Sequence, residues 1–149
     1  MRFKFRFDNI LKHRKIMQDL AKKDFLDAQI LVTNKQEVIK GYFNQIGKSR
    51  ETVFQVANEG GQFTLSGQQS EQFISLTQIR IRRAQQELRD LMMLAEEKKE
   101  VLVEATKELK KFEILKEKKH QEFKKLAQKK EAKELDDMTV MRNGIGDRL

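Results

Sequence analysis

The chain has 149 residues, of which 36% are charged and 38% hydrophobic, and it contains no Pro, Cys or Trp. This composition provides too few large apolar residues for an ordinary globular core, but enough for a linear seam between long helices. The absence of Cys excludes disulfides and thiolate metal sites. No apolar run reaches the ~18–20 residues of a membrane span, and residues 1–7 lack a signal-peptide core. We therefore expect a soluble intracellular protein without direct membrane insertion.

The first seven residues alternate aromatic and basic side chains, with Phe at positions 3, 5 and 7. A period of two is typical of an extended segment, but no second strand is predicted as its partner. We therefore expect an extended or frayed lead-in. Asp8 follows, and its carboxylate suits the N-terminus of a helix.

A first helix is predicted over residues 8–58. From Ala21 onward, alternating steps of four and three residues select mostly apolar side chains, which is the pattern of a coiled-coil seam. The two polar exceptions are Lys35 and Ser49. The seam positions are Ala21, Phe25, Ala28, Val32, Lys35, Ile39, Tyr42, Ile46, Ser49, Val53 and Val56.

A turn is predicted over residues 59–66. Gly60 and Gly61 can take the left-handed conformation that ends a helix. Ser66 and Gln69 then have the spacing of a capping box, which starts a new helix. A helix end followed by a helix start between two long periodic segments indicates a hairpin.

The second helix is predicted over residues 67–137, followed by a disordered end at 138–149. Its seam positions are Ile74, Thr77, Ile81, Ala84, Leu88, Leu91, Ala95, Lys98, Leu102, Ala105, Leu109, Phe112, Lys116, Lys119, Phe123 and Leu126. The prediction is an all-α fold, a single long two-helix antiparallel coiled-coil hairpin over 1–149.

The two arms of this hairpin are unequal in length, and the charge gathers at its open end. Residues 1–24 carry eight Lys/Arg and three Asp/Glu, and residues 110–133 carry ten and four. Asp8 should face residues near 115–120. Beyond that point we expect Phe123 and Leu126 to have no intramolecular partner on a basic helix.

No constellation for catalysis or metal binding is recognisable. Glycines 60 and 61 lack the Gly-Lys-Ser/Thr that completes a phosphate loop. His13 and His120 have no Cys or second His at ligand spacing, and both are expected on the surface. A two-helix hairpin offers no pocket in which to tune catalytic groups. We expect a non-enzyme without cofactor or metal.

The sequence resembles the flagellar type III export protein family FliJ over its whole length. The opening aromatic-basic segment is followed by Ile10, Leu11 and Arg14, and Gln72-Phe73 lies just after the predicted turn. The most specific stretch is the closing one. It comprises Leu115-Lys116-Glu117-Lys118-Lys119, Glu122-Phe123, Lys130-Glu131, Lys133-Glu134-Leu135-Asp136-Asp137 and Arg142.

The resemblance implies a non-catalytic coiled-coil stalk of the flagellar export apparatus, similar to the central stalk of rotary ATPases. Its implied partners are a hexameric FliI-like export ATPase, an FlhA-like export gate protein and export chaperones. The implied location is the cytoplasm, at the inner face of the membrane at the flagellar base. The stalk would promote assembly and activity of the ATPase and link it, with the chaperones, to the gate.

Two partner-binding sites are hypothesised. A gate-binding patch comprises Tyr42, Phe43, Ile46 and Phe73, of which Phe73 matches the family's Gln-Phe position. An ATPase-binding patch at the basic end comprises Lys118, Lys119, Phe123, Leu126 and Lys130.

Two alternatives remain open at this point. A basic coiled coil could bind nucleic acid through its phosphates, although no base-reading module is recognisable and no nucleic acid is expected. An exposed seam could also pair with a second copy in a self-associating structural protein.

Overall fold

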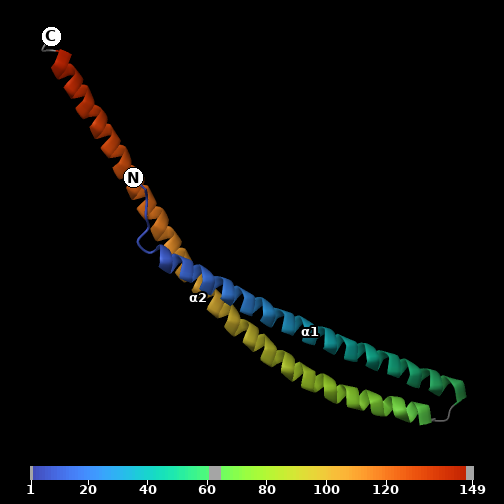
Figure 1. Ribbon diagram of the computed structural model, residues 1–149. Coiled ribbons are helices and arrows are strands. Elements are labelled where there is room, and N and C mark those ends of the chain that lie inside the picture. The colour runs from blue at the N-terminus through green and yellow to red at the C-terminus, as the bar shows by residue number, and fades with distance from the viewer. Residues whose placement is uncertain (1, 61–64, 147–149) are drawn as a thin grey trace. The chain divides into compact units, whose positions relative to one another are not determined.

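The computed structural model describes residues 2–60 and 65–146 as two long helices preceded by a short non-helical segment. Helix α1 spans Asp8–Gly60 (53 residues) and helix α2 spans Leu65–Gly146 (82 residues) (Figure 1). The described residues form no strand. The all-α antiparallel hairpin predicted from the seam periodicity is confirmed.

The packing divides the chain into two units, Leu20–Val103 and Met1–Asp19 with Glu104–Leu149. In the first unit α1 and α2 lie side by side along their predicted seam. Every predicted seam position of this unit is buried or half-buried. The most enclosed apolar side chains are Ala21, Ala28, Ile39, Ile46, Ile81 and Ala84. Small and β-branched residues at these positions let two helices pack closely along a narrow line.

Thr77 is the most enclosed residue of this unit, with none of its surface exposed. A buried hydroxyl is costly unless it is hydrogen-bonded. Thr77 Oγ1 donates to the carbonyl oxygen of Phe73 one turn earlier, at 2.7 Å. The helix itself therefore satisfies the hydroxyl, and a threonine can occupy a seam position.

Lys35 was a polar exception in the predicted seam, and the structure gives its reason. Lys35 Nζ lies 2.7 Å from Glu87 Oε2 on α2. The Lys35 ammonium group donates a hydrogen bond to the Glu87 carboxylate and thereby holds the pKa of Glu87 below its ordinary value. A charged residue is tolerated here because it has a partner on the other helix.

In the second unit, residues 2–19 pack against α2 from Glu104 onward. Residues 2–7, called the lead-in from here on, contain no helix and end in a turn. The Asp8 amide donates to the Phe5 carbonyl at 3.2 Å, and the Leu11 amide donates to that of Phe7 at 2.9 Å. These bonds connect the extended lead-in to the first turn of α1. Leu109 is the most enclosed apolar side chain of this unit.

The helix ends differ from those predicted. Helix α1 continues to Gly60, and α2 begins at Leu65, one residue before the predicted cap Ser66. The rest of the predicted turn, residues 61–64, lies outside the described residues. The expectation of a disordered end from residue 138 is wrong as far as Gly146, because α2 continues there. That stretch contains no proline, and its two glycines, Gly144 and Gly146, each cost a helix only about 1 kcal/mol.

Neither described helix combines the length and the apolar character that a membrane crossing would require.

Candidate partner-binding site

Two aromatic side chains of the lead-in, Phe3 and Phe7, pack onto α2. The Phe3 ring lies 4.8 Å from the ring of His120 and 5.5 Å from that of Phe123, between centroids. The Phe7 ring lies 6.4 Å from that of Phe112 and 5.8 Å from that of Phe5. Tilted and edge-on pairs at these distances are favourable aromatic geometries. The lead-in is therefore anchored to α2 through Phe3 and Phe7, and Phe5 packs on Phe7.

Two predictions about this end of the chain are wrong for the same reason. Phe123 was expected to have no intramolecular partner, and His120 was expected on the surface. Both are half-buried because the Phe3 ring lies against them. His13 is exposed, as predicted. Leu126 remains 66% exposed.

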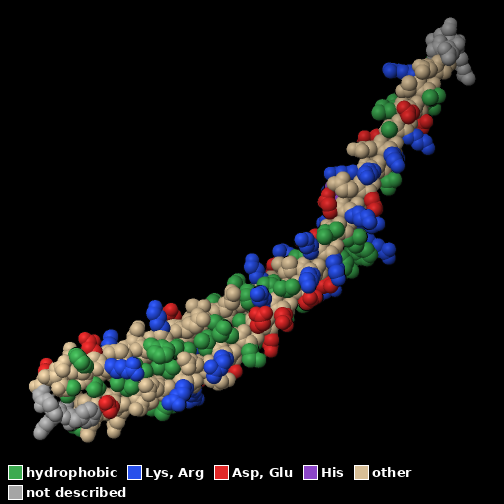
Figure 2. Space-filling model, turned by 180° about the vertical axis from the view of Figure 1, so that it is seen from behind, with side chains coloured by type: hydrophobic (Ala, Val, Ile, Leu, Met, Phe, Trp, Pro, Cys, Tyr) green, Lys and Arg blue, Asp and Glu red, His purple; other side chains and the backbone are tan. Residues whose placement is uncertain are grey.

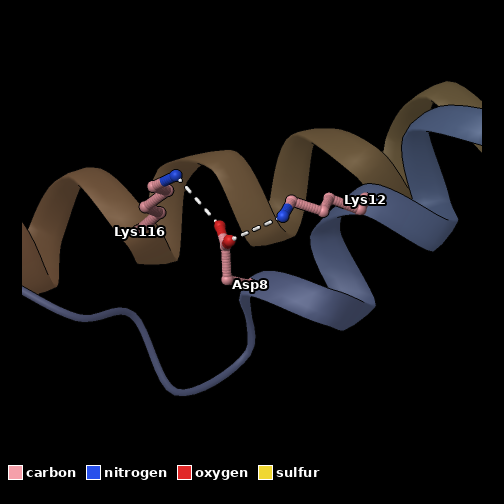
Figure 3. A network of polar contacts seen from close by, with 3 residues as sticks. All are labelled: Asp8, Lys12 and Lys116. Atoms are coloured by element: carbon pink, nitrogen blue, oxygen red, sulfur yellow. Dashed lines mark hydrogen bonds and ion pairs between the residues drawn. The ribbon is translucent and has the colours of Figure 1, made fainter.

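Asp8 anchors the start of α1 to α2, as Figure 3 shows. Its carboxylate lies 3.1 Å from Lys116 Nζ and 3.5 Å from Lys12 Nζ. The pKa of Asp8 lies below its ordinary value, and the hydrogen bond from Lys116 is the largest cause. Desolvation opposes it, and the charges of Lys116 and Lys12 lower the pKa further. The pairing of Lys116 with Asp8 agrees with the predicted facing of Asp8 and residues 115–120.

The pKa of Asp8 gives a direct test of this contact. We expect Lys116→Ala to raise the pKa of the Asp8 carboxyl, and Lys12→Ala, the matched control, to raise it less, because the Lys116 hydrogen bond is the larger cause. A carboxyl group whose pKa is lower in the folded state than in the unfolded state stabilises the folded state at pH values above the ordinary Asp pKa of about 3.9. This stabilisation is lost as the pH falls through the pKa of the folded state. Carbon-detected NMR titration of Asp8 measures both shifts. Equal shifts in the two variants would contradict the helix-to-helix contact.

A cleft lies between the lead-in and α2. Phe3, Phe123 and Leu126 contribute its apolar lining, and Arg2, Lys4 and Arg6 of the lead-in contribute charge to it. Lys119 and Glu122 line it from α2 and pair with each other at 3.4 Å. On the face that Figure 2 shows, hydrophobic side chains gather where the lead-in lies on α2, and Lys and Arg side chains border them.

The structure brings only part of the hypothesised ATPase-binding patch together. Lys119, Phe123 and Leu126 line the cleft, whereas Lys118 does not. Lys130 lies further along α2, beside Leu126 in a neighbouring hollow. All three lysines are exposed.

The hypothesised gate-binding patch divides into exposed and enclosed residues. Phe43 is 53% exposed and Phe73 is 37% exposed, so both can be reached from outside. Tyr42 is half-buried, and Ile46 is 5% exposed because it belongs to the seam. Ile46 is therefore enclosed between the helices, whereas the two phenylalanines are the most exposed residues of the hypothesised patch.

The lead-in is the part of the site that the sequence predictions missed. Arg2, Phe3 and Lys4 line the cleft, yet none was proposed as a binding residue. The period of two in residues 1–7 was the available signal, because it places the aromatic side chains on one side of an extended segment. The pattern could not predict that the aromatic side of this segment packs on α2.

A search of protein families matches residues 3–144 of the chain to the family described as flagellar FliJ protein. Comparison with curated proteins and with solved structures found no match in either set.

Proposed function

Because the chain belongs to the FliJ family, a non-catalytic component of flagellar protein export, we propose that it is the coiled-coil stalk of the export ATPase. In this role it binds the hexameric ATPase and promotes the assembly and activity of the ring. It also links the ring, with export chaperones, to the export gate. The protein acts through binding surfaces.

One observation supports the ATPase contact above all. Helix α1 begins at Asp8, opposite Lys116, whereas α2 continues to Gly146. From Lys124 onward every described side chain of α2 is exposed except that of Ala127, which is half-buried. A helix with both lysines and exposed apolar residues suits insertion among the helices of another protein, since charge steers the encounter and apolar contacts hold it.

The proposed gate contact rests on Phe43 and Phe73. Large exposed aromatic side chains are characteristic of binding surfaces, and both residues lie in the unit Leu20–Val103, away from the cleft in sequence. Under this proposal the ATPase contact and the gate contact would lie on different units of the chain.

Stimulation of the purified export ATPase tests the stalk function. We expect the double variant Phe123→Ala, Leu126→Ala to lose the stimulation even at low salt, because the desolvated contact is removed. The control is Leu135→Ala, Met138→Ala, which removes two exposed apolar side chains further along the same helix. Lysine substitutions at 118, 119 and 130 should slow association, and their effect should fade as salt rises.

Two results would contradict the proposal. The first is full stimulation by the variant lacking Phe123 and Leu126. The second is a requirement for the lysines alone together with competition by nucleic acid, which would favour the phosphate-binding alternative.

A further inference from the structure

The seam of α2 continues after α1 has ended. Its steps of three and four residues run on through Lys119, Phe123 and Leu126. Helix α1 reaches only to Asp8, which pairs with Lys116. The seam of α2 after Lys116 is therefore not covered by α1. This uncovered stretch is about ten residues long, or ~15 Å along α2.

The lead-in covers this stretch only in part. The Phe3 ring packs on His120 and Phe123, while Leu126 lies in the same cleft and stays 66% exposed. An extended segment thus forms one wall, and α2 forms the other. The space between them offers an apolar strip to a second helix.

The charge around this strip is mostly positive. Arg2, Lys4 and Arg6 stand on the lead-in wall, and within the described part of the chain no ion pair joins them to a carboxylate. On the α2 wall, Glu122 is already paired with Lys119. An occupant with carboxylates along both edges of an apolar face would complement this cleft, whereas a basic or purely apolar helix would not.

We propose that the cleft between the lead-in and α2 receives an acidic amphipathic helix of a partner protein, which continues the seam where α1 ends. This inference rests on the proposed function, because it states the chemistry of the segment that this end of the stalk would bind. The occupant presents apolar residues at heptad spacing to Phe3, Phe123 and Leu126. Its glutamates or aspartates face Arg2 and Lys4.

A synthetic peptide tests the cleft without any ATPase. The probe has about two heptads, with Leu at the a and d positions and Glu elsewhere, and a fluorescent label. We expect the purified full-length chain to bind it. Leu126→Ala and the double variant Arg2→Glu, Lys4→Glu should each weaken binding at least about tenfold, that is by ~1.4 kcal/mol.

Matched controls separate the cleft from general charge attraction. Leu135→Ala removes an equally exposed leucine further along α2, and Lys22→Glu, Lys23→Glu makes the same charge change outside the cleft. Both should bind the probe as the unmodified chain does. A peptide in which Ser replaces every Leu should bind at least tenfold more weakly.

Three outcomes would overturn the inference: no binding of the probe, equal losses in the control variants, or equal binding of the peptide without leucines. The outcomes for the two proposals are separable. If the probe fails to bind but ATPase stimulation still requires Phe123 and Leu126, the cleft inference falls and the stalk function stands. If the probe binds as expected but the chain does not stimulate the ATPase, the cleft inference stands and the stalk function falls.

Discussion

Replacing Ile81 with Asp should lower the free energy of unfolding by about 4 kcal/mol or more, because a carboxylate would be forced into the seam. Ile81 is 5% exposed, at the centre of the unit Leu20–Val103. The variant loses the packing of a large aliphatic side chain and gains an unpaired charge. Thermal unfolding followed by circular dichroism should show a melting temperature lower by more than about 10 °C.

Ile79 provides a matched control for this experiment. It lies two residues earlier on the same helix, but its side chain is 58% exposed. Ile79→Asp makes the same chemical change on the outer face of α2 and should change stability by less than about 1 kcal/mol. Similar melting temperatures for the two Asp variants would mean that the seam does not pass through Ile81.

Replacing Ile46 with Ala should cost about 2–4 kcal/mol of stability, because the side chain is 5% exposed and its removal leaves a cavity. Phe43 lies three residues earlier and is 53% exposed, so its removal should leave no cavity between the helices. Phe43→Ala should leave the melting temperature nearly unchanged and weaken binding to the export gate protein. Thermal unfolding and calorimetric titration with the purified gate domain measure the two quantities.

The pair of variants distinguishes a surface patch from a wide seam. A large loss of stability in Phe43→Ala would show that this ring belongs to the packing between helices. Full gate binding by the variant lacking both Phe43 and Phe73 would remove the hypothesised patch, while the seam role of Ile46 would be unaffected.

The seam could be predicted from the sequence because its cause is local. Side chains three and four residues apart share a face of a helix, so the positions of Ile39, Ile46, Ile81 and Ala84 in the pattern already determine which face is buried. Lys35 also lies on this face, and its charge is accommodated because Glu87 lies opposite it on α2. The two-helix fold thus required no long-range information beyond the turn.

The site was less predictable because it depends on contacts between segments far apart in the sequence. Phe3 and Phe123 are separated by almost the whole chain, and no local pattern states that one packs on the other. The hypothesised residues Phe123 and Leu126 do line the cleft, but the basic wall carrying Arg2 and Lys4 could be recognised only from the fold. The continuation of α2 past Asp137 was missed for a different reason, because the sequence there contains no proline that would end the helix.

The ion pair between Lys35 and Glu87 has a consequence for how the two helices can slide past each other. A heptad seam of small aliphatic side chains tolerates a shift of seven residues, since apolar positions still meet apolar positions. Such a shift would set Lys35 against Arg80 or Leu94 in place of Glu87. Either arrangement separates Lys35 from Glu87, so this polar contact favours the observed alignment over the shifted ones. The effect of this pair on the alignment of the helices therefore matters more than its small contribution to stability.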